Sequence, residues 1–154
     1  MKYWIMKSEP DVFSIDDLAK NKRKTDHWDG IRNYEARNFI RDEMLKCDLA
    51  FFHHSNCKDP GIVGIVEIVR EAYPDITAFD PTHKYYDPKS DPKHPRWFMV
   101  DIRLTRKLKR KISLRELKKH KALRDMRLLK RGNRLSILPV TAKQWNYIIK
   151  LEDN

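Results

Sequence analysis

The sequence predicts an α+β fold, in which helices decorate a mostly antiparallel, curved or barrel-like sheet. Segments with a strand pattern outnumber segments with a long helical pattern. Successive strand segments are joined by loops rather than by the regular helical crossovers that parallel strands need. The clearest strand runs from Phe98 to Leu104, where every second residue is a large apolar one, as expected of a strand with one buried face.

Short apolar runs bounded by turn residues give the strands of this sheet. They predict strands over residues 3–7, 49–54, 62–69, 98–104 and 135–138. Pro139 ends the last of them. Between Pro74 and Pro95 the chain has five prolines in 22 residues, which excludes a helix or a central strand. We therefore expect a long loop there, of a kind that is usually functional or disordered.

Capping residues predict where the helices begin. Four helices are expected to start after Ser14, Asn33, Ser113 and Thr141. The first is short and ends at about Lys20. The second reaches Met44, because apolar residues between them fall on one face at helical spacing. Residues 27–30, which separate these two helices, are expected to form a turn.

Length and composition are those of one folded domain over residues 1–154. No apolar run approaches the roughly 20 residues of a membrane span, and charge interrupts the N-terminus too early for a signal peptide. The two cysteines, Cys47 and Cys57, imply no disulfide framework and favour a reducing, cytoplasmic location. Only four glycines occur and no Gly-rich phosphate loop can be written, so we expect no cofactor.

Positive charge is concentrated in one stretch of the chain. The sequence has 33 Lys+Arg against 22 Asp+Glu, a net charge of +11. Residues 103–134 hold 15 of the cations and only two acids, Glu116 and Asp125, so this stretch carries +13 and the rest −2. A nearly neutral body with one basic stretch indicates a polyanion lying along one side of the protein. A solvated, solubilising face is the alternative.

Neither a metal centre nor a catalytic site is indicated. His53 and His54 lie near Cys57, but adjacent residues of a strand point to opposite faces and make poor joint ligands. No CxxC or HxxxH spacing supports structural zinc. A single cysteine near a histidine is common and does not indicate a nucleophile. We expect no metal, and we expect a protein that is not an enzyme.

Trp28 lies in a polar stretch where no helical or strand period requires an indole. The same seven residues, 27–33, also contain Arg32 and Asn33. An indole can stack on a nucleobase, and amide and guanidinium groups can read its edge, so this stretch has the makings of a base pocket. The alternative is a tryptophan that covers the core.

Several segments resemble the EVE domain family, in consistent order from about Tyr3 to Leu151. They are residues 3–11, 28–34, 36–39, 54–56, 61–64, 79–81, 85–90, 96–101 and 131–136. Stand-alone bacterial EVE proteins are the most similar members, and the mild departure lies at residues 137–138. The resemblance implies a PUA-like fold, a curved antiparallel β-barrel flanked by helices, similar to the YTH domain that holds a methylated adenine in an aromatic cage. It also implies a reader of modified bases in DNA or RNA, such as 5-methylcytosine and its oxidised forms.

The resemblance further implies a pocket for one flipped base. Its residues are Trp4, Lys7, Ser8, Glu9, Trp28, Ile31, Arg32, Asn33, His54, Ser55, Asn56, Tyr86, Arg134, Leu135 and Ser136. Trp28, with Tyr86, would stack on the base, and polar groups would read its edge. Ile31 and Leu135 would form an apolar wall for a methyl group, a contribution of roughly 0.8 kcal/mol.

Phosphate groups would be held around this pocket by cations. Lys7, Arg32 and Arg134 would act close to the base. The basic stretch would anchor the remaining phosphates through Lys107, Lys109, Arg110 and Lys111, which makes the affinity salt-dependent. The expected partner is therefore DNA or RNA that carries a modified base. No membrane is involved, and a monomer is the default.

Two other functions stay open. ASCH domains, which share the PUA-like fold, include proteins that look like amide hydrolases of modified nucleosides and that use a lysine, a hydroxyl and a carboxylate. Lys7, Ser8 and Glu9 offer these groups, although neighbours on a strand alternate faces and converge only at a bend. A pocket for a small metabolite or a peptide is the other alternative, and the basic stretch makes it less attractive.

Overall fold

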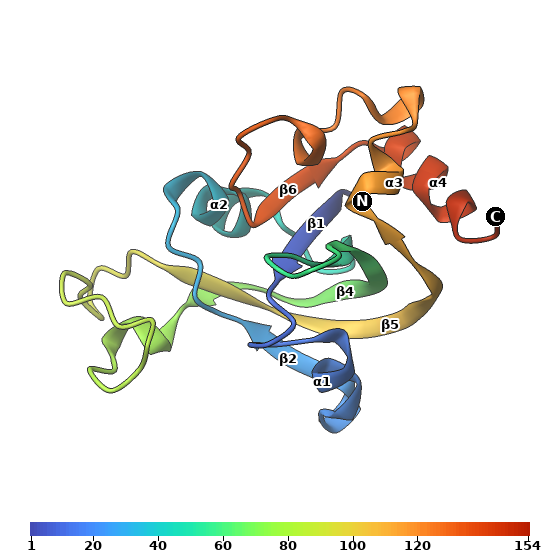
Figure 1. Ribbon diagram of the computed structural model, residues 1–154. Coiled ribbons are helices and arrows are strands. Elements are labelled where there is room, and N and C mark those ends of the chain that lie inside the picture. The colour runs from blue at the N-terminus through green and yellow to red at the C-terminus, as the bar shows by residue number, and fades with distance from the viewer.

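Six strands form one sheet in the order β2-β5-β4-β3-β1-β6, in a computed structural model that describes residues 1–154 (Figure 1). Their bounds are Tyr3–Ser8 (β1), Thr25–Trp28 (β2), Leu49–His54 (β3), Gly61–Pro74 (β4), Phe98–Ser113 (β5) and Ile137–Val140 (β6). β1 and β3 pair in parallel, and all other neighbours are antiparallel. The predicted α+β, PUA-like class is confirmed, with the refinement that the sheet is mixed.

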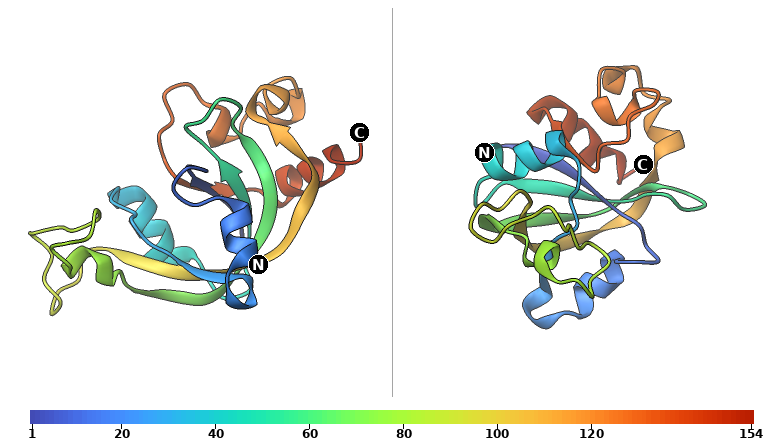
Figure 2. Two further views of the ribbon diagram at one scale, coloured as in Figure 1. Left: turned by 60° about the horizontal axis from the view of Figure 1, so that its bottom comes forward. Right: turned by 90° about the vertical axis from the view of Figure 1, so that its left-hand side faces the viewer.

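The two long central strands bend the sheet. β4 has 14 residues and β5 has 16, and their pairing shifts register at four places. Each irregularity bends the strands and increases their twist. Both strands therefore sweep around the molecule as arcs (Figure 2). β2 and β6 lie at the two edges of the sheet, so the hydrogen-bond ladder does not close into a full ring.

Four α-helices flank this sheet. They are Ile15–Lys20 (α1), Tyr34–Asn38 (α2), Leu114–Leu117 (α3) and Ala142–Leu151 (α4). The capping boxes expected at Ser14 and Thr141 are present, and the side chains of Asn33 and Ser113 also cap their helices. The second helix is shorter than predicted, because a π-helical turn over Phe39–Glu43 replaces its second half.

Three segments differ from the sequence-based prediction. Residues 27–30 are not one turn, because His27 and Trp28 complete strand β2 and pair with β5. β5 continues to Ser113, so the cations of residues 103–111 lie on a strand. Pro139 lies inside β6, which is possible because β6 is an edge strand whose outer side needs no N–H donor.

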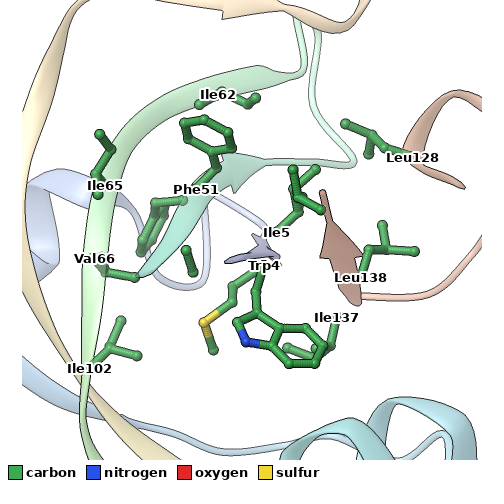
Figure 3. Packing of buried hydrophobic residues seen from close by; sticks show 14 of the residues in the cluster. Trp4, Ile5, Phe51, Ile62, Ile65, Val66, Ile102, Leu128, Ile137 and Leu138 are labelled. Atoms are coloured by element: carbon green, nitrogen blue, oxygen red, sulfur yellow. The ribbon is translucent and has the colours of Figure 1, made fainter. Parts of the chain in front are cut away.

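The core covers both faces of the central strands (Figure 3). On one face, Trp145 of α4 stacks on Phe51 with ring centroids 3.9 Å apart. On the other face, Trp28 meets Phe52 edge to face at 5.5 Å. Side chains from both faces are thus sealed, and functional groups on β1 and β3 can reach solvent only where these strands end.

The proline-rich segment between β4 and β5 is an ordered loop that projects from the sheet (Figure 1). Its anchor is Asp75, whose side chain is fully buried. This carboxylate accepts a hydrogen bond from the backbone N–H of Gly30 at 2.8 Å and from Arg32 at 3.1 Å. At the far end, the indole N–H of Trp97 donates to Asp87 at 2.7 Å. The loop is therefore fastened to residues 30–32, which lead into α2.

No helix in the structure combines the length and the apolar character needed to cross a membrane.

Candidate nucleic-acid interface

A row of hydrogen bonds joins predicted site residues where β1 and β3 end. The backbone N–H of Lys7 donates to the carbonyl of Ser136 at 2.8 Å, and that of Ser55 donates to the carbonyl of Ser8 at 3.0 Å. The side-chain amide of Asn56 donates to the Glu9 carboxylate at 2.8 Å. Three segments far apart in the sequence, residues 7–9, 55–56 and 136, thus meet at one edge of the molecule.

The first depression lies at one end of this row. Its volume is about 380 Å³, within the range of roughly 300–1,000 Å³ usual for small-molecule sites. It is lined by Asn33, Glu35, Arg127, Lys130, Arg131, Gly132, Asn133, Arg134 and Leu135. Three predicted pocket residues, Asn33, Arg134 and Leu135, are therefore brought together, and Leu135 directly precedes the Ser136 that binds Lys7.

The lining of the first depression is polar and cationic. The Asn33 side-chain oxygen caps α2 by accepting from the N–H of Ala36 at 3.0 Å, which leaves its amide NH₂ without a partner in the protein. The ion pair of Arg127 with Glu35, at 2.7 Å, ties the lining loop to α2. Lys130, Arg131 and Arg134 have no carboxylate partner. The depression therefore offers hydrogen-bond donors and uncompensated positive charge.

A second depression lies at the other end of the row. It has a volume of about 660 Å³ and is lined by Pro10, His54, Cys57, Lys58, Asp59, Lys111, Ser113 and Arg115. His54 does not point its ring freely into this space, since Nε2 accepts from the N–H of Ile15 at 3.1 Å at the start of α1. Burial lowers the pKa of His54, which keeps the ring neutral and able to accept this bond.

Lys7 and His53 are neighbours in the parallel β1–β3 register and share one face. Lys7 is half-buried and makes no side-chain hydrogen bond or ion pair, and burial lowers its pKa. His53 is 1% exposed, and neither ring nitrogen has a partner. Burial lowers the pKa of His53 to about 3, so the imidazole is neutral at physiological pH.

Three predicted pocket residues lie in the core rather than at the surface. Trp4 is 1% exposed, and its indole N–H donates to the buried Asp48 at 3.1 Å. Trp28 is 6% exposed and packs against Phe13 and Phe52. Ile31 is also buried. A base could contact these side chains only if the surrounding structure opened. Covering the core, the alternative considered for Trp28, describes its position.

Tyr86 lies on the proline-rich loop with 40% of its surface exposed and lines neither depression. Arg32 is fully engaged with that loop. Its guanidinium donates to Asp75 at 3.1 Å and twice to the carbonyl of Tyr85, at 3.1 and 2.7 Å. These bonds direct Arg32 toward the loop and away from any phosphate. Its visible role is to hold the loop and the residues before α2 together.

The four cations expected to anchor phosphates are all paired within the protein. Lys109 binds Asp153 at 2.6 Å, and Lys111 binds Asp59 at 2.8 Å. Lys107 binds Asp16 and Arg110 makes a two-point contact with Glu116. Their carboxylate partners come from distant parts of the chain, so the sequence could not reveal that these charges are compensated.

The structure adds Lys130, Arg131 and Asn133 to the candidate site. They lie beside the predicted Arg134, inside a segment that carries the family resemblance. The signal that could have identified them is the absence of acids from residues 126–134. No group of three or more potential metal ligands occurs in the structure.

This geometry, a curved mixed sheet with a cationic depression where its central strands end, also occurs in solved structures. The human THYN1 protein in complex with 5-methylcytosine-containing DNA superposes with a TM-score of 0.95 and 45% identity, covering 100% of this chain and 99% of that one. A protein from Pseudomonas syringae gives a TM-score of 0.93 at 47% identity, covering 97% and 99%. Mouse thymocyte nuclear protein 1 is 48% identical over 98% of this chain and 74% of its own length.

The family model for the EVE domain matches residues 2–151, which is nearly the whole chain. The protein therefore belongs to the EVE domain family, as the resemblance of its segments predicted.

Proposed function

We propose that this protein is a non-catalytic reader of a modified base in nucleic acid, of the 5-methylcytosine type. The observation that carries the proposal is the first depression, where unpaired cations surround a free amide at the ends of the central strands. Family membership supports it, since a structural relative is described as a complex with 5-methylcytosine-containing DNA.

In this proposal the flipped base enters the first depression. The free Asn33 amide donates to an acceptor on the base edge, and Leu135 offers apolar surface to a methyl group. Lys130, Arg131 and Arg134 bind the flanking phosphates, and half-buried Lys7 faces the same edge of the sheet. Stacking by Trp28 stays a prediction that requires the base to displace part of the packing around the indole.

The arrangement at Lys7, Ser8 and Glu9 favours a reader over an amide hydrolase. The Ser8 hydroxyl donates to the carbonyl of Phe13 at 2.6 Å, and the Glu9 carboxylate binds Asn56. A hydroxyl committed to a carbonyl has no base beside it to activate it as a nucleophile. Release of amine from modified cytidines on incubation with the protein would establish the hydrolase instead.

DNA is the first candidate nucleic acid, since the complex among the structural relatives contains DNA, and RNA is the second. We propose a monomer in the cytoplasm. The support is limited to the sequence: no segment predicts an oligomer, and both cysteines, Cys47 and Cys57, are free thiols.

The test compares matched oligonucleotides that carry either 5-methylcytosine or cytosine, by fluorescence anisotropy. Wild type is expected to prefer the modified base. Asn33→Ser keeps a side-chain acceptor for the α2 cap but removes the amide donors, so it should abolish the preference without unfolding the protein. Asn38→Ser, in the same helix but outside the depression, is the control. An Asn33→Ser variant with an intact preference would contradict the proposed contact, and a wild type without preference would overturn the function.

A further inference from the structure

The second depression has the chemistry of a phosphate site. Lys58 and Arg115 line it, are exposed, and have no carboxylate partner. Lys111 lines it too, with its Nζ 2.8 Å from Asp59. Only one lining residue is hydrophobic, so the depression is unsuited to an apolar ligand. Three cations against one carboxylate leave an excess of positive charge in a concave polar surface, which suits the diffuse charge of phosphodiesters.

Two connections join this depression to the first one. The row of hydrogen bonds ends at Glu9 and Asn56, and the next residues in each segment, Pro10 and Cys57, line the second depression. Residues 115–134 form the other connection, because Arg115 lines the second depression and Arg127 to Arg134 line the first. Between these ends the segment carries four cations without a carboxylate partner, Lys118, Lys119, Lys121 and Arg124.

We propose that the second depression binds backbone phosphates of the same nucleic acid whose modified base enters the first depression. The sugar–phosphate chain then follows residues 115–134 from Arg134 to Arg115. This inference rests on the proposed function, but it assigns a separate site, with Lys58 and Arg115 as its phosphate ligands.

Asp59 makes the second depression adjustable. The hydrogen bond from Lys111 holds the pKa of Asp59 below its usual range, so the carboxylate stays charged at neutral pH and compensates Lys111. A phosphate that approaches Lys111 has to compete with this carboxylate. Removing the Asp59 charge should therefore strengthen binding, whereas removing Lys58 and Arg115 should weaken it.

The experiment measures binding of a 5-methylcytosine duplex, and of the same duplex with cytosine, over a range of salt concentrations. The double variant Lys58→Gln/Arg115→Gln is expected to lower the slope of log affinity against log salt by about 1.4–1.8, the value for two lost phosphate contacts. Asp59→Asn should bind both duplexes more tightly than wild type. Lys143→Gln/Lys150→Gln removes two exposed, unpaired cations from α4, away from both depressions, and should leave the slope unchanged.

A slope in Lys58→Gln/Arg115→Gln equal to that of wild type would overturn the second site. The preference for 5-methylcytosine is measured in the same titrations and reports on the first depression alone. If the slope falls while wild type shows no preference, the phosphate site stands and the reader function fails. If the preference is present and the slope does not change, the reader function stands without the second site.

Discussion

The two halves of the basic stretch have similar composition and different surroundings. All six cations of residues 103–111, on β5, have a carboxylate within ion-pair distance. Of the nine cations in residues 115–134, only Arg127 has one. A strand in the middle of the fold brings its side chains against acids from α1, α4 and the β3–β4 loop. The second half passes over the sheet edge, where no such neighbours exist. Paired cations therefore serve the fold, and unpaired cations are free for a polyanion.

The largest effect is expected where a paired cation is also buried. Arg32 faces Asp75, whose side chain is inaccessible to solvent. Arg32→Ala leaves this carboxylate without its charged partner and should lower the free energy of unfolding by about 3–5 kcal/mol. Urea denaturation measures the change.

Arg41→Ala is the control for Arg32→Ala, because Arg41 is paired with Asp42 on an exposed surface and its loss should change stability little. If Arg32→Ala unfolds like wild type but binds oligonucleotides weakly, then Arg32 contacts phosphate, as the sequence-based hypothesis has it. That result would break the rule that paired cations serve the fold.

His53 sharpens the comparison, since it is a basic side chain kept uncharged. Its pKa is lowered to about 3 in the folded protein, against an ordinary value of 6.5, so the unfolded chain binds more protons between these values. Stability is therefore complete above pH 6.5 and is lost as pH falls, by about 2 kcal/mol between pH 7 and pH 5. His53→Phe should flatten this dependence and leave no donor or acceptor unpaired.

Chemical denaturation at several pH values tests the His53 prediction, with the exposed His94→Gln as the control. His54, whose pKa is also lowered, keeps a smaller dependence of the same sign in His53→Phe. Equal pH profiles for His53→Phe and wild type would mean that His53 is solvated by water inside the fold and is not the source of acid lability.

Local signals in the sequence predicted the elements of the fold, whereas the state of each charge required the tertiary structure. The caps at Ser14 and Thr141 act within three residues, so the sequence contains both partners. The partners of Lys107 and Lys109 are 91 and 44 residues away, and no periodicity shows them. For the same reason Trp28 could be assigned neither to the core nor to the surface from its polar neighbours. Its burial depends on Phe13 and Phe52, on other elements.

Binding should respond most to the unpaired cations of the first depression. Lys130→Gln/Arg131→Gln/Arg134→Gln is expected to weaken binding of modified and plain duplexes alike, roughly tenfold, and to lower the salt slope by about 2.1–2.7. The unfolding midpoint should not move, because these side chains form no ion pair. Anisotropy titrations and thermal denaturation separate the two effects. A loss of stability without a change in slope would assign these cations to the fold.

The smallest effect on binding is expected from an equal number of cations removed from β5. Arg103→Gln/Lys107→Gln/Lys109→Gln takes away three charges that Glu67, Asp16 and Asp153 already compensate, so affinity for a duplex should change less than about twofold. The same anisotropy titration measures it. Because the net charge changes equally in this variant and in Lys130→Gln/Arg131→Gln/Arg134→Gln, any difference between them reports position and pairing rather than total charge. Equal losses of affinity would mean that nucleic acid responds only to the overall field of the protein, and the distinction between the two halves of the basic stretch would have no functional content.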